Sequence, residues 1–368
     1  MILFRLTALL ILLNTVVSVS PVRAADHAII LQYHHVSNTT PEITSISPEL
    51  FKEHLDYLQQ HNFTIWPLSK IARYLREGIR LPDKCVAITF DDAYHSIYST
   101  AFPLLREKNW PFTLFLNTDA VGRSSMSLSW DEVREMNASV AEIGNHSHTH
   151  THLVRQQKNE SLQQWRARVI NEIQTAQQLI DQQLATGKAS PPHLFAYPYG
   201  EYSLALYQII HELGYAAVGQ HSGPAGFDSP IELLPRFPMG GIYTKKKQLI
   251  EKLNTYPLPV ENNEVIEPIV ELNNTGSPLL KLTIKPEFRN KNLKRNFQCY
   301  VSGQGKALIK WRENTAYIRA EKKLGIGRNH YNCTAPVTFT EQGRSRHGFY
   351  WYSQLWIKRH ENGRWYRE

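Results

Sequence analysis

The sequence predicts an α/β domain of about 230 residues followed by a small all-β domain. Between residues 28 and 253, short apolar runs alternate with amphipathic segments, as strands alternate with helices in α/β folds. Residues 255–288 are rich in Pro, Asn and Glu, and are interpreted as a linker. Residues 289–368 contain aromatic or period-two runs between Gly, Asn and charged turns, which favours a β-sandwich.

The first 24 residues are interpreted as a secretory signal peptide. Arg5 precedes an apolar run over residues 6–17, and Val22 and Ala24 stand three and one before the expected cleavage point. An uncleaved anchor is the alternative, but the run is shorter than the roughly 18 to 20 residues that span a bilayer. The mature chain is therefore expected to be a secreted or periplasmic monomer without a transmembrane segment.

Helix signals support the α/β pattern over residues 25–254. Ser47 followed by Pro48 predicts an N-cap with proline at the first helical position. The longest predicted helix ends at Gly187. Its apolar stripe, at spacings of three and four, is Leu162, Trp165, Val169, Ile173, Ala176, Leu179 and Ile180. The runs expected as strands of this domain are AIILQY, VAITF, FTLFL, AEIGNH, HLFAYP and YAAVG.

The expected β domain contains six strand-like runs and two of the three cysteines. The runs are FQCYV, ALIKW, TAYIRA, CTAPVTF, FYWYSQLWI and RWY. Cys299 and Cys333 are expected to form a disulfide, because export leads to an oxidising compartment. Closing this loop contributes about 3.5 to 4 kcal/mol in the chain-entropy model. Cys85 lies in an apolar run and is expected in the core.

The net charge of +8 is unevenly distributed along the chain. Residues 289–368 contain 17 Lys and Arg but only five Glu and no Asp, so this segment carries +12 and the rest carries −4. An export signal makes nucleic acid an improbable partner. A solvated basic face without a partner is the simplest interpretation, and among partners an anionic polymer or membrane of the cell envelope is expected.

Consecutive carboxylates follow one of the buried strands. Asp91 and Asp92 come directly after residues 86–90, at the end of a strand where α/β folds build their sites. Two adjacent acids can be divided between cation binding and service as a base. A polar turn or a helix cap is the alternative interpretation.

Four alternating histidines form the second unusual segment, and they indicate a metal site. They are His146, His148, His150 and His152. In a strand all four share a face, whereas in a helical turn only residues four apart do, as His146 and His150 are. Two imidazoles and one carboxylate leave coordination positions open for water and substrate. Surface solvation and loose metal scavenging are the alternatives.

With these motifs in that order, the sequence resembles the polysaccharide deacetylases of carbohydrate esterase family 4 over residues 29–237. Residues 89–92 (TFDD), 146–150 (HSHTH) and 198–200 (PYG) resemble the three family motifs. Residues 33–36 (YHHV) are similar to the branch that includes bacterial poly-β-1,6-N-acetylglucosamine deacetylases. The resemblance implies a distorted (β/α) barrel and a hydrolase acting on carbon–nitrogen bonds other than peptide bonds.

The resemblance also implies a role for each motif residue. Asp91 is expected to be the general base, and Asp92, His146 and His150 to hold one divalent metal ion. Zinc is expected there, with cobalt, nickel or iron as alternatives. The backbone N–H of Tyr199 is expected to stabilise the oxyanion.

Two departures from the family pattern concern the base and the acid. The Arg that usually precedes the third motif is replaced by Ala196, and Arg236 is expected to take its place beside the base. His34 is expected to be the general acid, while His35 points to the opposite face of a strand.

The expected substrate is an N-acetylglucosamine-containing polysaccharide. An O-acetyl (xylan-type) esterase and a non-catalytic carbohydrate-binding protein are the alternatives. The β domain is expected to be an accessory unit that takes no part in the chemistry, because every catalytic candidate precedes the linker.

Overall fold

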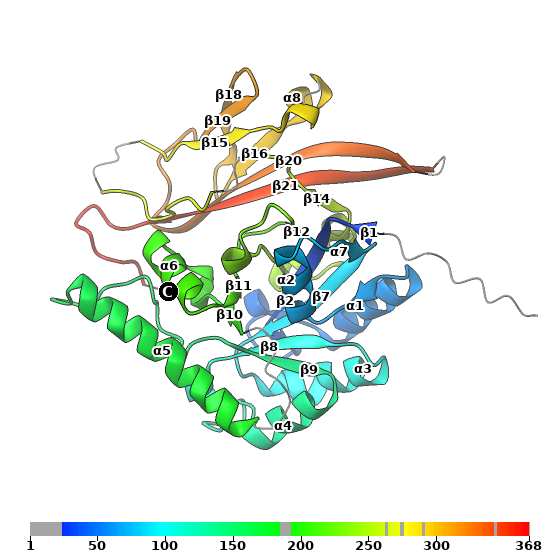
Figure 1. Ribbon diagram of the computed structural model, residues 1–368, viewed down its shortest axis with the longest axis vertical. Coiled ribbons are helices and arrows are strands. Elements are labelled where there is room, and N and C mark those ends of the chain that lie inside the picture. Colours follow the sequence, from blue (N-terminus) through cyan, green and yellow to red (C-terminus); the bar gives the residue numbers. More distant parts are fainter. Residues whose placement is uncertain are drawn as a thin grey trace, which may run out of the picture.

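The computed structural model describes residues 24–184, 193–261, 264–272, 276–288, 291–341 and 344–367. Residues 1–23 of the expected signal peptide, and the expected helix stop at Gly187, lie outside these ranges. The described residues form an α/β domain with a β domain stacked on one side of it (Figure 1). Among the residues placed here, none of the helices has the length and apolar character that a membrane crossing needs.

A curled, mostly parallel sheet forms the centre of the α/β domain. Its strand order is β11-β10-β9-β8-β7-β2-β12, with β5 added beside β7 and β13 beside β2. Only β12 runs antiparallel to its neighbour among these pairs. The strands are β2 (His27–Tyr33), β5 (Thr64–Ile65), β7 (Cys85–Asp91), β8 (Phe112–Leu116), β9 (Ala141–Asn145), β10 (Leu194–Ala196), β11 (Ala216–Val218), β12 (Ala225–Gly226) and β13 (Phe237–Pro238). The predicted α/β class is therefore confirmed, and the barrel is half closed.

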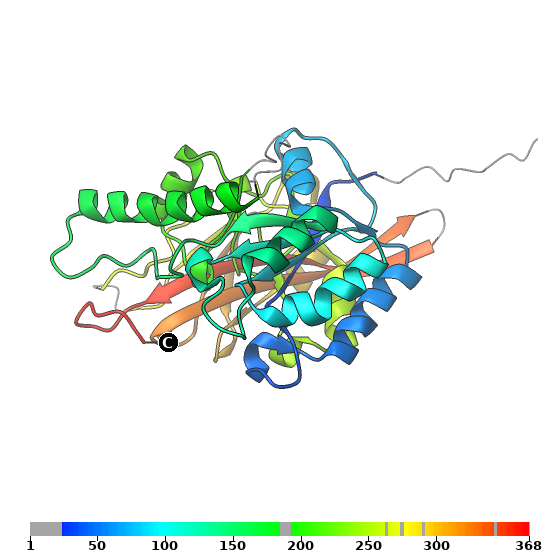
Figure 2. The ribbon, with the colours of Figure 1, turned by 90° about the horizontal axis from the view of Figure 1, so that it is seen from below.

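Helices surround this sheet, and those of residues 102–183 lie on the side away from the β domain (Figures 1 and 2). They are α1 (Pro48–Gln60), α2 (Leu68–Arg76), α3 (Phe102–Glu107), α4 (Trp130–Ser139), α5 (Leu162–Gln183), α6 (Leu204–Glu212) and α7 (Lys246–Leu253). Two short strand pairs are β1 (Ala24–Ala25) with β6 (Leu81–Pro82), and β3 (His35–Val36) with β4 (Ser45–Ile46). Short helical turns are η1 (Glu42–Thr44), η2 (Ile97–Ala101), η3 (Thr118–Ala120), η4 (Pro198–Gly200), η5 (Ile231–Leu233) and η6 (Gly241–Tyr243).

Local sequence signals place the helix ends and faces. The predicted cap of α1 is confirmed, because the Ser47 hydroxyl accepts a hydrogen bond from the Leu50 N–H and Pro48 is the first helical residue. In α5 the predicted stripe is buried at five positions, Trp165, Val169, Ile173, Ala176 and Ile180. Leu162, the first residue of the helix, is instead exposed, and Leu179 is partly buried.

Both faces of the central strand β2 are buried. Ile29, Leu31 and Tyr33 pack in one apolar cluster, and Ala28 and Ile30 pack in another on the opposite face. This is the pattern of a parallel strand covered on both sides. Cys85, as predicted, is a buried residue of the second cluster.

The β domain consists of two sheets that share one apolar core. One sheet has the order β14-β21-β20-β16-β17, and the other has the order β15-β19-β18. The strands are β14 (Thr255–Pro257), β15 (Leu280–Thr283), β16 (Gln298–Val301), β17 (Gly305–Lys306), β18 (Leu308–Arg312), β19 (Thr315–Arg319), β20 (Gly327–Glu341) and β21 (Arg344–Lys358), joined by η7 (Pro286–Phe288) and α8 (Lys291–Asn296). The predicted disulfide is present, because Cys299 and Cys333 face each other across β16 and β20.

Two features of this domain differ from the sequence-based expectation. The segment interpreted as a linker contributes β14 and β15 to the two sheets. The run RWY at residues 364–366 is not a strand, because this tail packs on the α/β domain, where the Arg155 side chain donates to the Tyr366 carbonyl at 3.0 Å.

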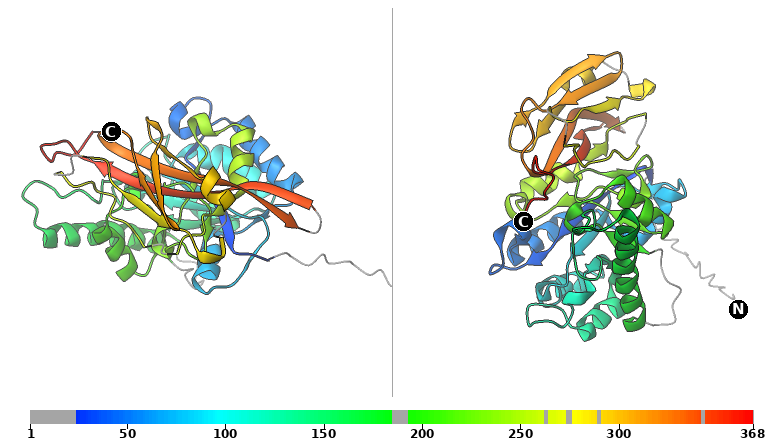
Figure 3. Two further views of the ribbon diagram at one scale, coloured as in Figure 1. Left: turned by 90° about the horizontal axis from the view of Figure 1, so that it is seen from above. Right: turned by 90° about the vertical axis from the view of Figure 1, so that its left-hand side faces the viewer.

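The long β20–β21 ladder forms the junction between the domains (Figures 1 and 3). The Trp351 ring contacts the Phe237 ring with 5.4 Å between their centres, and its indole N–H donates to the Ser222 hydroxyl at 3.0 Å. Farther along β21, Arg346 donates to the Asp83 carboxylate at 3.1 and 3.4 Å. The β domain is therefore packed against the α/β domain at several separate points.

Candidate active site

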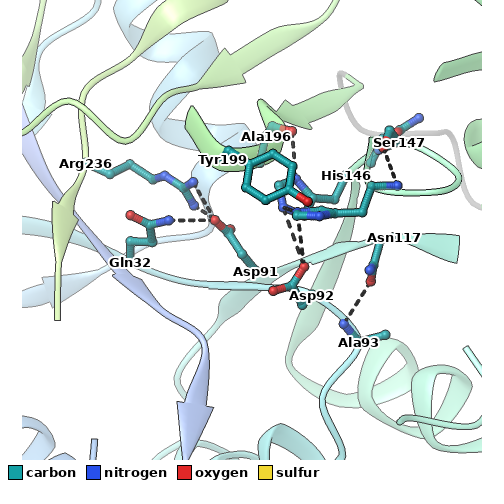
Figure 4. Close-up of polar contacts among 12 residues, drawn as sticks. Gln32, Asp91, Asp92, Ala93, Asn117, His146, Ser147, Ala196, Tyr199 and Arg236 are labelled. Atoms are coloured by element: carbon teal, nitrogen blue, oxygen red, sulfur yellow. Dashed lines mark hydrogen bonds and ion pairs between the residues drawn. The ribbon is translucent and has the colours of Figure 1, made fainter. Parts of the chain in front are cut away.

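The sequence motifs meet at the carboxyl ends of three parallel strands of the central sheet. Asp91 is the last residue of β7, His146 follows β9, and the Pro198–Gly200 turn follows β10. Strands β7, β8, β9 and β10 are consecutive and parallel, so their following loops gather at one edge of the sheet. Figure 4 shows Asp91, Asp92, His146 and Tyr199 around this edge.

Three potential metal ligands converge at this edge. The Nε2 atoms of His146 and His150 are 3.2 Å apart, and they lie 3.8 and 3.5 Å from Asp92 Oδ1. Ligand atoms about 2 Å from a tetrahedral zinc lie about 3.3 Å from one another. The spacing of the three atoms therefore fits a single small cation.

The hydrogen bonding of these side chains also fits a cation. The Nδ1 N–H of His146 donates to the Ala196 carbonyl at 2.8 Å, which leaves its Nε2 lone pair directed at the site. Asp92 Oδ1 is buried and has no hydrogen-bond partner. Burial, followed by the charge of His146, lowers the pKa of His150 to about 4, so its ring is neutral at physiological pH. An orphaned carboxylate oxygen beside two imidazole nitrogens is the donor set expected of a metal centre.

A turn, and not a helix, brings His146 and His150 together. The segment has no helical assignment, and Ser147 and His150 have positive φ angles of 65° and 55°. The Ser147 N–H donates to Asn145 Oδ1 at 2.8 Å, and the His150 N–H donates to the Ser147 hydroxyl at 3.1 Å. The helical turn considered from the sequence is therefore wrong, and the segment is a turn held by side-chain hydrogen bonds.

Backbone strain is concentrated at this site. Besides Ser147 and His150, Asp92 and Tyr199 also have positive φ angles, of 70° and 59°. The left-handed region costs a residue with a Cβ about 1–2 kcal/mol. Such strain persists where surrounding contacts hold it, and it is common at functional sites.

Asp91 lies beside the potential metal ligands and is held by a buried arginine (Figure 4). Arg236 donates from Nη1 to Asp91 Oδ1 and from Nη2 to Oδ2, each at 2.7 Å. Gln32 donates to the same Oδ2 at 2.7 Å. Burial alone raises the pKa of Asp91, but the opposing charge of Arg236 holds this pKa well below its ordinary value. The carboxylate is therefore ionised, and one of its roughly four acceptor positions remains for another proton donor.

The two N-terminal histidines differ in their surroundings. His34 is partly buried, and its electrostatic interaction is among the smaller causes that lower the pKa of Asp91 and His150. The His35 ring is buried and stacks on Tyr94 with 3.6 Å between the ring centres. His34 therefore interacts electrostatically with Asp91 and His150, whereas His35 interacts with Asp92.

The Pro198–Gly200 turn needs glycine at its last position. Gly200 has a φ of 67°, and a Cβ there would lie 2.5 Å from Gln220 Cβ. The turn directs the Tyr199 ring toward His150 and His152, with ring centres 4.5 and 3.9 Å away.

The other two histidines have partners of their own. His148 is hydrogen-bonded through Nδ1 to the Thr118 hydroxyl at 2.9 Å. His152 is hydrogen-bonded through Nδ1 to the Glu201 carboxylate at 2.8 Å. Neither belongs to the group of three potential ligands found among the described residues.

Two residues of the site were missed by the sequence analysis. Gln32 is a polar residue within the apolar run AIILQY, and that irregularity was the available signal. Tyr94 follows the two aspartates by two positions, and burial followed by the charge of Asp92 raises its pKa well above the ordinary value. No pattern in the local sequence distinguishes Tyr94 from a core aromatic.

Fold and site together define the chain as an α/β protein with a candidate metal centre at the carboxyl edge of its sheet. Residues 78–218 match the family model described as polysaccharide deacetylase. The resemblance predicted from the three motifs is confirmed. The enzyme class predicted from it, a hydrolase, is that of this family.

Curated relatives of this chain are named as polysaccharide N-deacetylases. The chain is 26% identical over 161 residues to a poly-beta-1,6-N-acetyl-D-glucosamine N-deacetylase of Staphylococcus aureus, an alignment that covers 42% of this chain and 54% of the relative. It is 23% identical over 239 residues to the enzyme of that name from Escherichia coli, covering 56% of this chain and 35% of the relative. The chain thus spans about half the length of the Staphylococcus relative and about a third of the Escherichia coli relative.

Solved structures share the fold of the α/β domain. The deacetylase PplD of Streptococcus pyogenes in complex with acetate has a TM-score of 0.54 at 22% identity, covering 62% of this chain and 98% of that one. IcaB from Ammonifex degensii has a TM-score of 0.54 at 24% identity, covering 62% and 97%. The β domain therefore lies largely outside these similarities.

Proposed function

We propose that this protein is a metal-dependent hydrolase that removes N-acetyl groups from an N-acetylglucosamine-containing polysaccharide. The observation that carries the proposal is the convergence of Asp92, His146 and His150 on one point beside the arginine-held Asp91. The named activity of the curated relatives supports the choice of substrate.

Each residue is assigned one role in the reaction. Asp92, His146 and His150 hold the metal, for which zinc is proposed because two imidazoles and one carboxylate leave an open position. When bound, this ion polarises the acetamide carbonyl and lowers the pKa of a water molecule. Tyr199 donates its backbone N–H to the negative charge that develops on the carbonyl oxygen.

Proton transfers are assigned to Asp91 and His34. Asp91 accepts a proton from the attacking water at the acceptor position that Arg236 and Gln32 leave available. His34 then donates a proton to the departing nitrogen, because an amide nitrogen leaves as an amine only after protonation. Arg236 keeps Asp91 ionised and oriented throughout.

Acetate release from a panel of polymers tests this proposal. The purified chain is offered poly-β-1,6-N-acetylglucosamine, chitin oligomers, peptidoglycan fragments and acetylxylan, and metal content is measured alongside. We expect acetate only from N-acetylated polymers. Release from acetylxylan alone would support an O-acetyl esterase. A chain that binds metal and glycan but releases no acetate would be a carbohydrate-binding protein.

The proposed location is outside the cytoplasm, in the periplasm or beyond it. The Cys299–Cys333 disulfide supports this proposal, because disulfides persist in oxidising compartments. The apolar N-terminal run of the sequence supports it independently.

We also propose that the outer face of the β15–β19–β18 sheet binds an anionic envelope surface. Lys281, Lys310, Arg312 and Arg319 are exposed there, and the cross-strand register places Tyr317 between Lys281 and Lys310. Such a face attracts polyanions and repels a cationic, deacetylated product. Binding to anionic vesicles should weaken with salt and with Lys310→Glu, while binding that persists in both conditions would refute this role.

A further inference from the structure

The β domain contacts the turn that carries the third motif. Arg328, near the start of β20, donates from Nη1 to the Tyr199 carbonyl at 2.8 Å. Its guanidinium carbon lies 5.6 Å from the centre of the Tyr199 ring. A residue 129 positions farther along the chain therefore holds both the backbone and the ring of Tyr199.

A second line of contacts reaches the same ring from the C-terminal tail. The Tyr366 hydroxyl donates to one carboxylate oxygen of the buried Glu201, and the other oxygen is hydrogen-bonded to His152 at 2.8 Å. The His152 ring lies nearly parallel to the Tyr199 ring, with an angle of 13° and 3.9 Å between the centres. Arg155 fixes the tail by donating to the Tyr366 carbonyl at 3.0 Å.

We propose that the β domain completes the active site, with Arg328 and Tyr366 as positioning residues for the Tyr199 turn. This inference rests on the proposed function. Tyr199 has a left-handed φ of 59°, a conformation that a residue with a Cβ keeps only under external constraint. The direction of its N–H depends on that conformation. Arg328 holds the carbonyl side of the residue, and Tyr366 holds the ring through Glu201 and His152.

The framework of the β domain sets the position of Arg328. Strand β20 pairs with β21 from Gly327 opposite Lys358 onward, and the disulfide at Cys333 joins β20 to β16. From β21, the Gln354 side chain donates to the buried Tyr202 hydroxyl at 3.1 Å, three residues after Tyr199. The deacetylase family match ends at residue 218, so this constraint is a property of the additional domain.

Paired arginine variants test the proposal. Arg328→Ala removes a β-domain guanidinium at the Tyr199 turn, whereas Arg346→Ala removes one that bonds Asp83 elsewhere on the domain junction. On a short N-acetylated oligosaccharide, we expect Arg328→Ala to lower kcat about 10- to 100-fold, the usual range for a lost charge-assisted hydrogen bond. KM and metal content should stay within about twofold, and Arg346→Ala should keep kcat. Arg328→Lys should recover part of the loss.

Hydrogen exchange gives a readout that needs no activity. The Gly200 N–H donates to the Tyr197 carbonyl at 2.8 Å, and the Glu201 N–H donates to the Pro198 carbonyl at 3.1 Å. These amides should exchange faster in Arg328→Ala and in Tyr366→Phe than in Arg346→Ala.

Equal kcat values for the two arginine variants, or unchanged exchange in Arg328→Ala, would overturn the proposal. A wild-type chain that releases no acetate would contradict the proposed function. The exchange experiment would then still decide whether the β domain holds the turn.

Discussion

The ion pair between Arg236 and Asp91 leads to a quantitative prediction about stability. Both side chains are fully buried, and Arg236 also donates to the Gly219 carbonyl at 2.9 Å and to the Thr89 hydroxyl at 3.1 Å. Arg236→Met keeps an unbranched side chain in the space, but of the three hydrogen bonds described for the Asp91 carboxylate it leaves the one from Gln32. Removing one partner of a buried pair costs about 3–5 kcal/mol. At about 2–4 °C per kcal/mol, the melting temperature should fall by about 6–20 °C.

A double-mutant cycle separates this pairing from the packing of the arginine stem. Asp91→Asn, Arg236→Met and the double variant are unfolded in urea with a chelator present, because a bound metal would add its own stabilisation. We expect the double variant to lose less free energy of unfolding than the two single variants lose together, since it leaves no buried charge unpaired.

The loss of stability caused by Arg236→Met should also depend on pH. Without the arginine, burial raises the pKa of Asp91, so proton uptake favours the folded variant and the deficit shrinks as the pH falls. A loss below about 1 kcal/mol, or strictly additive losses in the cycle, would refute the reasoning.

Three further predictions concern the metal, the base and acid stability. His146→Ala or His150→Ala should weaken metal binding more than about 100-fold while His148→Ala keeps it; metal analysis showing the reverse pattern would change the ligand assignment. Asp91→Asn should lower acetate release about 10²- to 10⁴-fold and retain the metal; loss of the metal would assign Asp91 as a ligand. Burial lowers the pKa of His54 to about 4. As the pH falls, the unfolded chain therefore takes up a proton at this residue before the folded chain does. Stability should fall between about pH 6.5 and pH 4, by at most about 1.4 kcal/mol per pH unit from this residue. In urea titrations, His54→Gln should make this slope shallower, and an unchanged slope would exclude His54 as its source.

Local patterns in the sequence determined much of the fold and indicated which motif residues form the site. Strand and helix periods, the Ser47 cap and the position of each motif after a strand depend on residues only a few positions apart. Because parallel strands bring their carboxyl ends to one edge, the order of the motifs already predicts that Asp92 and His146 lie close together.

The turn geometry of the histidine segment was not available from the sequence. A spacing of four residues is compatible with a helix, and only the positive φ angles at Ser147 and His150 show how the two rings meet. These angles depend on side-chain caps and on the neighbouring strand, which are contacts that the local sequence does not specify.

Tertiary structure decided how the reacting groups are held. The pairing of Arg236 with Asp91, 145 positions away, was expected from the family resemblance alone, and the contact of Arg328 with Tyr199, 129 positions away, was not expected at all. No hydrophobic period or turn signal relates residues so far apart, because their contact depends on how whole sheets pack. The sequence therefore identified the motif residues of a deacetylase domain, while the packing of the β domain against the Tyr199 turn could be found only in three dimensions.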